Sequence, residues 1–377
     1  MVRNDGMQKL RGSGKTVRAT LKHRSHRRMK LPCLGLHFSL AILMIVPLRA
    51  DESVPLAWEK LPSIPDAEGF AGSFAGVVSD QLIVAGGANF PGGRPWEGGR
   101  KVWYDSIWSL ASPGGEWQRA GQLPHPLGYG VSVTTDQGLL CIGGSDATSH
   151  HAEVWLLQWR DDSLKCLPYP PLPAPCANAC GVKIDHFVYV CGGIPTAQST
   201  EASSSFWRLD LQALESGWQS LPSCPGPARM LAAAGASGDT FFLIGGAGLK
   251  SAADGSPERI WLRDAYAYDP KAGWRRLDDA PEISVAAPSP LPTLADGSIL
   301  LLGGDDGSQA QTAPTDHPGF PRAIRRYHPK EDRWTSAGTL PLGLVTTPLV
   351  LWQGRFVIPG GEQKPGVRST QAWSARP

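Results

Sequence analysis

Two glycine-rich segments, near opposite ends of the chain, carry the side chains best suited to chemistry on a small polar molecule. Residues 86–105 hold Asn89, Glu97, Lys101 and Tyr104, and residues 360–368 hold Glu362 and Arg368. A carboxylate can take a proton from a hydroxyl group, and a guanidinium can bind a carboxylate through two parallel hydrogen bonds. These residue types therefore allow acid–base catalysis and anion binding, provided that the fold brings the segments together.

Both segments begin at a Gly-Gly doublet that belongs to a repeated sequence pattern. An apolar run that ends in Gly-Gly occurs six times, at residues 82–87, 139–144, 188–193, 241–246, 299–304 and 356–361. A four-residue apolar run without helical period predicts a strand buried on both faces. The glycine pair then ends each strand where the backbone needs unusual dihedral angles and close approach. Successive doublets are 49 to 58 residues apart, which predicts one four-stranded blade per repeat.

Aromatic residues complete the pattern. An aromatic strand follows most doublets, and a further tryptophan precedes a Leu-Pro turn, as at Trp117, Trp218 and Trp334. This pattern is typical of kelch repeats. The sequence therefore predicts an all-β fold, a single six-bladed kelch-type β-propeller over residues 51–377. The sixth doublet lacks its own Trp and Leu-Pro turn, which stand instead at 58–62. We expect the N-terminal strand to close the sixth blade and remove an exposed sheet edge.

Propeller topology predicts where the polar residues gather. The loop after the second strand of a blade and the segment before the next inner strand emerge on the same face. Residues just past each Gly-Gly should therefore surround one mouth of the channel. This adds two candidates, Arg229 just before a predicted inner strand and His317 in the long loop after Gly304.

Residues 1–50 differ from the rest. They carry eleven Lys/Arg and one acid, whereas the remaining residues carry 25 basic and 33 acidic side chains. Basic residues, an apolar run over 31–48 and Ala50 form a secretory signal pattern, with Met29 as a possible true start. We expect export to the periplasm or outside the cell with cleavage near Ala50; an uncleaved anchor is the alternative. The acidic body argues against nucleic acid as a partner, and we expect no membrane contact beyond the signal segment.

The cysteines predict neither a metal site nor a cofactor. One disulfide among Cys166, Cys176, Cys180 and Cys224 is possible, but its pairing cannot be read from sequence. A zinc site would need tighter Cys or His spacing. A copper radical oxidase, which also uses a kelch-type propeller, would need a Cys, two Tyr and a His pair that this pattern does not offer.

Both glycine-rich segments resemble those of the sialic acid mutarotases, the N-acetylneuraminate epimerases, which are six-bladed kelch propellers. The chain is most similar to the cyclically permuted branch of that family. Residues 66–144, including Gly72-Ser73-Phe74-Ala75-Gly76, resemble the C-terminal part of the unpermuted enzymes but come first here. The segment from Glu362 to Arg368, which is mid-chain in those enzymes, comes last.

The resemblance implies an isomerase that interconverts the anomers of N-acetylneuraminate or a related acidic sugar. It implies Glu362 and Arg368 as the catalytic pair. From the chemistry of these side chains, we expect Glu362 to be the base and Arg368 to hold the substrate carboxylate. Substrate contacts are then expected from Asn89, Glu97, Lys101, Tyr104, Arg229 and His317. The alternative is a propeller that only binds a carbohydrate or protein. A shared pocket for Glu362 and Arg368 would favour the enzyme, and an open face would favour the binding protein.

Overall fold

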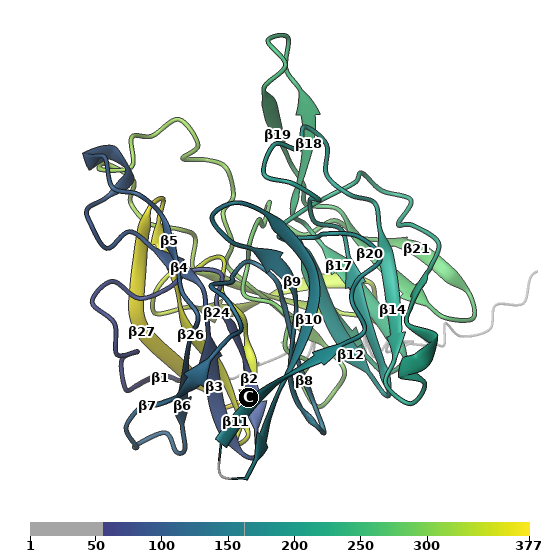
Figure 1. Cartoon of the computed structure of the whole chain (residues 1–377). Coiled ribbons are helices and arrows are strands. Elements are labelled where there is room, and N and C mark those ends of the chain that lie inside the picture. The colour runs from purple at the N-terminus through teal and green to yellow at the C-terminus, as the bar shows by residue number, and fades with distance from the viewer. Residues whose placement is uncertain (1–55, 162) are drawn as a thin grey trace, which may run out of the picture. The chain divides into compact units, whose positions relative to one another are not determined.

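The computed structural model describes residues 56–161 and 163–377, and the basic leader with Met29 lies outside them. Six antiparallel sheets are arranged as the blades of a propeller (Figure 1), which confirms the predicted fold class. The innermost strands of neighbouring blades contact one another around the central axis. Within the described residues, no helix has the length and apolar character needed to span a bilayer.

Blades 1 to 4 each contain four strands, in chain order from the axis outwards. Blade 1 has β2 (Phe74–Val78), β3 (Gln81–Ala85), β6 (Ser106–Leu110) and β7 (Gln118–Gln122). Blade 2 has β8 (Val131–Thr135), β9 (Gly138–Ser145), β10 (His150–Arg160) and β11 (Ser163–Tyr169). Blade 3 has β12 (Cys180–Ile184), β13 (Phe187–Cys191), β14 (Phe206–Asp210) and β15 (Trp218–Ser220). Blade 4 has β16 (Ala233–Ser237), β17 (Thr240–Ile244), β20 (Ala265–Asp269) and β21 (Gly273–Leu277).

Blade 5 departs from this plan. It contains β22 (Ile299–Leu302), β23 (Ala323–His328) and β24 (Arg333–Thr339), without a regular inner strand. Residues 287–293 take the inner position, where Leu291 bridges Gly235 and Thr293 bridges Ile299. This segment holds three prolines, which cannot donate to a sheet ladder. The prolines therefore account for the interrupted strand.

Blade 6 joins the two ends of the described chain. It contains β25 (Val350–Trp352), β26 (Arg355–Lys364) and β27 (Val367–Ala375), with β1 (Trp58–Leu61) as its outermost strand. β1 pairs with β27 in antiparallel register from Trp58–Ala375 to Leu61–Ala372. The predicted closure by the N-terminal strand is therefore confirmed, and β27 has a partner on both sides.

Tryptophans of the outer strands connect consecutive blades. The indole N–H of Trp117 in blade 1 donates to the carbonyl of Pro62, just past β1, at 2.9 Å. Trp218 donates to Pro170 at 2.8 Å, and Trp334 donates to Asp278 at 3.0 Å. These three tryptophans thus bury apolar surface and also satisfy a carbonyl of the preceding blade.

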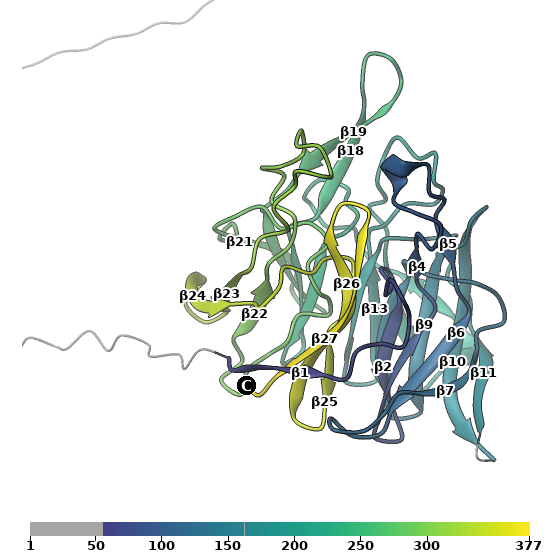
Figure 2. The ribbon, with the colours of Figure 1, turned by 90° about the vertical axis from the view of Figure 1, so that its left-hand side faces the viewer.

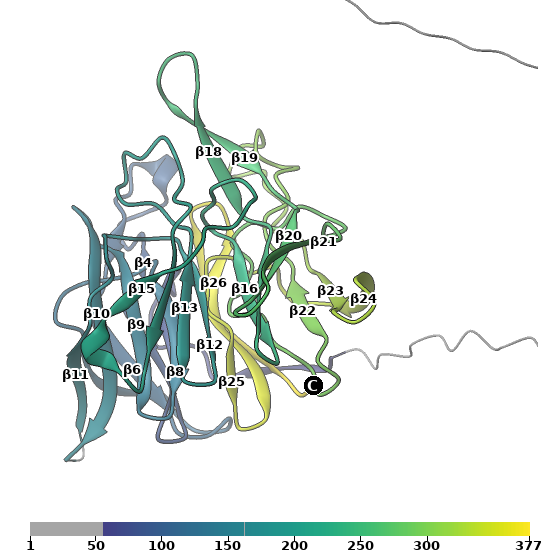
Figure 3. The same ribbon diagram turned by 90° about the vertical axis from the view of Figure 1, so that its right-hand side faces the viewer.

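Three projections rise from the end of the propeller that carries the Gly-Gly turns. They are the short hairpin β4 (Ala88–Asn89) and β5 (Val102–Trp103) with the 3-10 turn η1 (Pro95–Glu97), the hairpin β18 (Ala247–Ser251) and β19 (Pro257–Trp261), and the tip of β26–β27. All three extend towards the top of the ribbon in Figure 2 and Figure 3. A second 3-10 turn, η2 (Leu214–Ser216), lies between β14 and β15.

The cysteines of the described residues are all unpaired. Cys141, Cys176, Cys180 and Cys191 are buried, whereas Cys166 and Cys224 are partly exposed. Cys180 and Cys191 face each other across β12 and β13, yet the thiol of Cys180 lies 3.6 Å from the carbonyl oxygen of Cys191. The structure therefore packs these residues as small apolar side chains.

Candidate active site

A closed ring of backbone hydrogen bonds surrounds the propeller axis. One residue per blade contributes to it: Gly72, Tyr129, Asn178, Leu231, Ala286 and Thr346. Each N–H donates to the carbonyl of the ring residue in the preceding blade, and Gly72 closes the circle by donating to Thr346 at 2.7 Å. All six residues have φ between 52° and 67°. Five of them carry side chains in this left-handed region, which is uncommon and is retained where the surrounding structure requires it.

The ring separates two spaces on the axis. Below it lies a cavity of about 70 Å³ between the inner strands, lined by Gly130, Cys180 and Ser289 among others. Above it lies a cavity of about 560 Å³, lined by all the ring residues except Gly72 and by the projecting loops. That volume falls within the range of about 300–1,000 Å³ that ligand pockets usually have. The upper cavity is therefore the candidate active site.

Glu362 enters this cavity from blade 6. It directly follows Gly360-Gly361, whose φ angles of 78° and 121° permit the sharp turn out of the inner sheet. Its backbone pairs with Val345, the neighbour of the ring residue Thr346. Residues 362–368 form the upper part of the β26–β27 hairpin rather than an irregular loop, with Glu362 directly opposite Arg368. A hairpin holds the pair more rigidly than a loop would.

The side chains of this pair are in contact. Glu362 Oε1 lies 2.6 Å from Arg368 Nη1 and also accepts a hydrogen bond from the backbone N–H of Gly366 at 2.7 Å. The side chain of Glu362 is 18% exposed, whereas that of Arg368 is 3% exposed. The carboxylate is therefore accessible from the cavity, while the guanidinium is enclosed behind it.

Arg368 is held on several sides. Its Nε donates to the carbonyl of Ala88 at 3.3 Å, and Nη2 donates to the hydroxyl of Tyr129 at 3.5 Å. The guanidinium also lies over the ring of Phe90, 5.0 Å from its centroid. Nη1 is buried and has no aligned hydrogen bond despite its contact with Glu362. These contacts make Arg368 a fixed positive charge that orients Glu362.

Two cationic side chains line the cavity itself. Lys101, just before β5, places its ammonium 4.6 Å from the ring centroid of Tyr129 and 5.0 Å from that of Trp103. Arg259, on β19, lies over the ring of Trp261. Both side chains are more exposed than Arg368. They can therefore meet an anionic group of a ligand without displacing Glu362.

Asp305 also lines the cavity, although the sequence analysis did not select it as a candidate. It directly follows Gly303-Gly304, pairs with Val285 next to the ring residue Ala286, and lines the cavity. Burial raises the pKa of this carboxyl, with only partial opposition from the N–H of Gly307 and the charge of Arg259. The sequence does indicate this residue, because Asp305 directly follows a Gly-Gly doublet, as Glu362 does.

Asn89 and Tyr104 lie behind the cavity wall rather than on it. The amide nitrogen of Asn89 donates to Asp66 and to the carbonyl of Gly69, both at 3.0 Å, and its oxygen accepts from the Tyr104 hydroxyl at 2.8 Å. This network fixes the base of the β4–β5 hairpin. Both residues therefore support the loop that carries Lys101.

Glu97 belongs to η1 on the rim. Its Oε2 accepts a hydrogen bond from the N–H of Arg94 at 2.7 Å and so caps that turn. It does not line the cavity among the described residues. Its predicted contact with a ligand stays a prediction.

Arg229 and His317 are buried away from the upper cavity. Arg229 makes two hydrogen bonds of 2.8 Å with Asp264 and another to the carbonyl of Gly245, so it connects blade 3 to blade 4. His317 accepts a hydrogen bond from Gly319 and lines a side cavity of about 240 Å³, which shares Asp305 with the main one. Arg229 thus has protein partners for its guanidinium, and His317 is a neighbour of the site.

Comparisons with known proteins agree with this architecture. The sequence model of the N-acetylneuraminate epimerase family matches residues 48–166 and 169–312. The chain is 29% identical over 236 residues to the N-acetylneuraminate epimerase of Yersinia enterocolitica, covering 55% of this chain and 57% of that protein. It is 37% identical over 123 residues to the N-acetylneuraminate epimerase of Brucella suis, covering 28% and 31%. The chain thus spans about half the length of the first relative and a third of the second.

The fold is also similar to a solved structure. The structure of YjhT matches with a TM-score of 0.61 and 17% identity, covering 83% of this chain and 95% of that one. At this identity the match concerns the fold alone. The hairpin that carries Glu362 and Arg368 lies outside the residues matched by the family model, which however include Lys101, Tyr129 and Asp305. Because that model matches more than half of the sequence, the chain belongs to the N-acetylneuraminate epimerase family.

Proposed function

We propose that the protein is a mutarotase that interconverts the α and β anomers of N-acetylneuraminate or a closely related acidic sugar. The observation that carries this proposal is the contact between Glu362 and Arg368 at the wall of the upper cavity. A carboxylate held by a buried cation and open to a ligand-sized cavity suits proton abstraction. An open binding face would not need such a pair.

Glu362 is the base in this proposal. It takes the proton of the anomeric hydroxyl, and the oxygen electrons form a carbonyl as the bond from the anomeric carbon to the ring oxygen breaks. Arg368 is a positioning residue, because its enclosed guanidinium contacts the carboxylate of Glu362 and holds it towards the cavity. The hairpin N–H of Gly366 fixes the same oxygen, Oε1, which leaves Oε2 for the substrate.

Ring opening also needs a proton on the departing ring oxygen, and Asp305 is placed to supply it. It lines the same cavity from the adjacent blade, and burial raises its pKa, which favours the protonated form of the carboxyl. After rotation about the bond next to the carbonyl, the two proton transfers run in reverse and the ring closes as the other anomer. The reaction involves no oxidation or reduction. A base and an acid are therefore the only chemical groups that it needs.

Binding of the substrate carboxylate is assigned to the exposed cations. Lys101 and Arg259 lie on the cavity wall, whereas Arg368 could reach a carboxylate only by releasing Glu362. This differs from the role that we expected for Arg368 from its side-chain chemistry. Apolar groups of the sugar can pack against Trp103, Tyr129 and Phe320, which line the same space.

Time-resolved proton NMR tests the proposal. Freshly dissolved α-N-acetylneuraminate is followed with and without the protein, at a pH where spontaneous mutarotation is slow. We expect the relaxation to the β anomer to accelerate in proportion to protein concentration. Relaxation at the spontaneous rate, by protein that is folded by circular dichroism, would refute the assignment of this sugar.

A further inference from the structure

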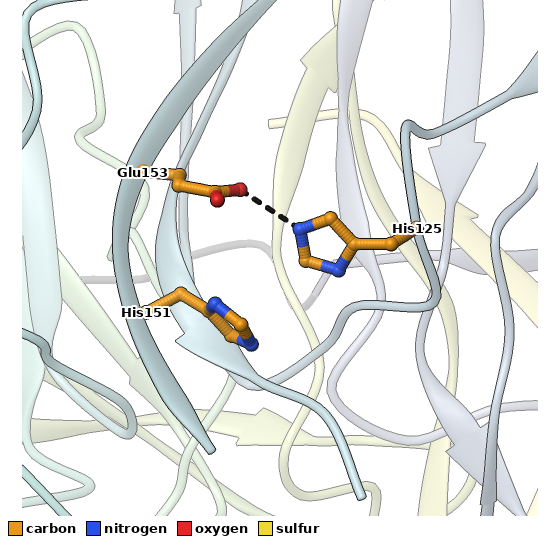
Figure 4. A group of neighbouring side chains, drawn as sticks. All are labelled: His125, His151 and Glu153. Atoms are coloured by element: carbon orange, nitrogen blue, oxygen red, sulfur yellow. Dashed lines mark hydrogen bonds and ion pairs between the residues drawn. The ribbon is translucent and has the colours of Figure 1, made fainter. Parts of the chain in front are cut away.

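A cluster of two histidines and one glutamate lies beside the candidate active site but outside its cavity. His125 belongs to the loop that connects β7 of blade 1 to β8 of blade 2, and His151 and Glu153 belong to β10. Figure 4 shows the three side chains facing one another across the gap between these elements. The atoms that they offer to a metal all lie within 4.8 Å of one another.

The contacts within the cluster are close. His125 Nε2 lies 2.8 Å from Glu153 Oε2, and the rings of His125 and His151 have centroids 4.8 Å apart. β10 shifts its register against β9 between His151 and Val154, and Glu153 lies within this irregularity. Such a bulge redirects side chains, which accounts for the convergence of His151 and Glu153 on His125.

Each member of the cluster also has an outer partner that orients it. His125 Nδ1 lies 3.1 Å from the carbonyl of Pro126, which leaves Nε2 to face Glu153. His151 Nε2 lies 2.9 Å from Asp146 Oδ2, which leaves Nδ1 for another ligand. The indole of Trp155 donates to Glu153 Oε2 at 3.1 Å. Metal-binding histidines commonly have a carboxylate or a carbonyl on their second nitrogen in this way.

We propose that His125, His151 and Glu153 bind a zinc ion, with water in the fourth position. Two imidazoles and one carboxylate form a donor set that zinc accepts in tetrahedral geometry, at about 2.0–2.1 Å per bond. Such bonds place the ligand atoms roughly 3.3 Å apart, so a small rotation of His151 completes the site. The side chains of His125, His151 and Glu153 are 29%, 19% and 45% exposed, which gives the ion a path from solvent.

The zinc would link the loop between β7 and β8 to β10, and so stabilise the junction of blades 1 and 2 next to the candidate active site. Asp146, the outer partner of His151, itself lines the upper cavity, as do the following residues up to His150. An ion on His151 therefore fixes the side chain that holds this wall of the cavity. The assigned role is structural, since none of the three ligands lines the cavity itself.

Calorimetric titration of ZnCl2 into untagged, chelator-stripped protein tests the site. We expect one zinc per chain, with the affinity reduced at least ~10- to 100-fold in His125→Gln and in Glu153→Gln. His186→Gln is the matched control, because His186 also contacts carboxylates, Asp185 at 2.6 Å and Asp210 at 4.0 Å, but has no second histidine. Its affinity for zinc should equal that of the wild type.

Two further measurements keep the test decisive. Substitution by Co2+ should give the visible bands of a tetrahedral nitrogen and oxygen site without a sulfur charge-transfer band. Zinc should raise the thermal midpoint of the wild type but not of Glu153→Gln, a variant that keeps the shape of the side chain. No zinc on the wild type, or equal affinity in all variants, would overturn the proposal.

Discussion

Asp305 and Glu362 occupy the same position in neighbouring blades. Each directly follows a Gly-Gly doublet, and each pairs with the residue that precedes a member of the axial hydrogen-bond ring, Val285 for Asp305 and Val345 for Glu362. The corresponding residues of the other blades are Ala88, Ser145, Ile194 and Ala247. The repeat therefore provides six equivalent places around one cavity, and two adjacent places carry carboxyl groups. One can act as the base and the other as the acid.

Replacing Glu362 by glutamine should abolish most of the mutarotase activity. The variant keeps the shape and the hydrogen bond from Gly366 but loses the base, so kcat should fall on the order of 10²-fold or more while binding persists. The measurement is the NMR relaxation rate at saturating sugar. Glu116→Gln, at an exposed position between β6 and β7, is the control and should retain the wild-type rate. Wild-type activity in Glu362→Gln would remove Glu362 from the base role.

Arg368→Lys distinguishes a positioning residue from a substrate anchor. Lysine keeps the charge but cannot reproduce the contacts with Glu362, Ala88 and Tyr129 together. We expect kcat to fall roughly 10-fold, equal to about 1.4 kcal/mol, with little change in KM. A rise in KM at unchanged kcat would instead place the substrate carboxylate on Arg368.

Lys101→Met should weaken substrate binding. Methionine retains apolar contact with Trp103 and Tyr129 but removes the charge that faces the cavity. We expect KM to rise about 10-fold, because a hydrogen bond to a charged group contributes on the order of 1.5 kcal/mol. Lys60→Met is the matched control. Lys60 belongs to β1 and lies over the ring of Trp373, outside the cavity. Equal KM values for the two variants would contradict the role of Lys101.

Asp305→Asn should change how stability depends on pH. Burial raises the pKa of Asp305 in the folded state, so the folded protein binds more protons than the unfolded chain between about pH 3.8 and that raised pKa. The stability contributed by the protonated form is complete below this window and is lost as pH rises through it. The variant cannot titrate, so its advantage over the wild type should grow across the window and level off above it.

Chemical denaturation at a series of pH values measures this difference. Asparagine can still accept the hydrogen bond from Gly307, so the fold should persist. The same variant should lower kcat on the order of 10²-fold if Asp305 is the general acid. Parallel stability curves for variant and wild type would show that the pKa of Asp305 is not raised.

Deleting residues 56–62 should destabilise the whole propeller. The deletion removes β1, exposes the edge of β27 and takes away the carbonyl of Pro62 that Trp117 uses. We expect the thermal midpoint to fall by more than ~5 °C, with aggregation on heating. Deleting residues 51–55 leaves β1 in place and is the control. An unchanged midpoint after the longer deletion would mean that β1 is dispensable for closure.

The amino-acid sequence alone determined the architecture, because a propeller repeats one structural unit, the antiparallel blade. Six apolar runs that end in Gly-Gly, and a Trp and Leu-Pro turn displaced to residues 58–62, predicted six blades and their closure. Most elements depend on neighbours within about one repeat, and the pairing of β1 with β27 is the long-range exception that closes the circle. The periodicity that singles out Glu362 also marks Asp305, because each of them directly follows a Gly-Gly doublet.

Tertiary structure decided which polar side chains face the cavity and what each contacts. Asn89 and Lys101 lie in the same segment, yet the network with Asp66 and Tyr104 turns Asn89 inwards while Lys101 faces the ligand space. Arg229 is neutralised by Asp264, 35 residues away. The cluster of His125, His151 and Glu153 has no recognisable spacing, because a turn between blades and a bulge in β10 bring it together. Such convergence depends on pairings distant in sequence and on side-chain direction, and neither is encoded in a local pattern.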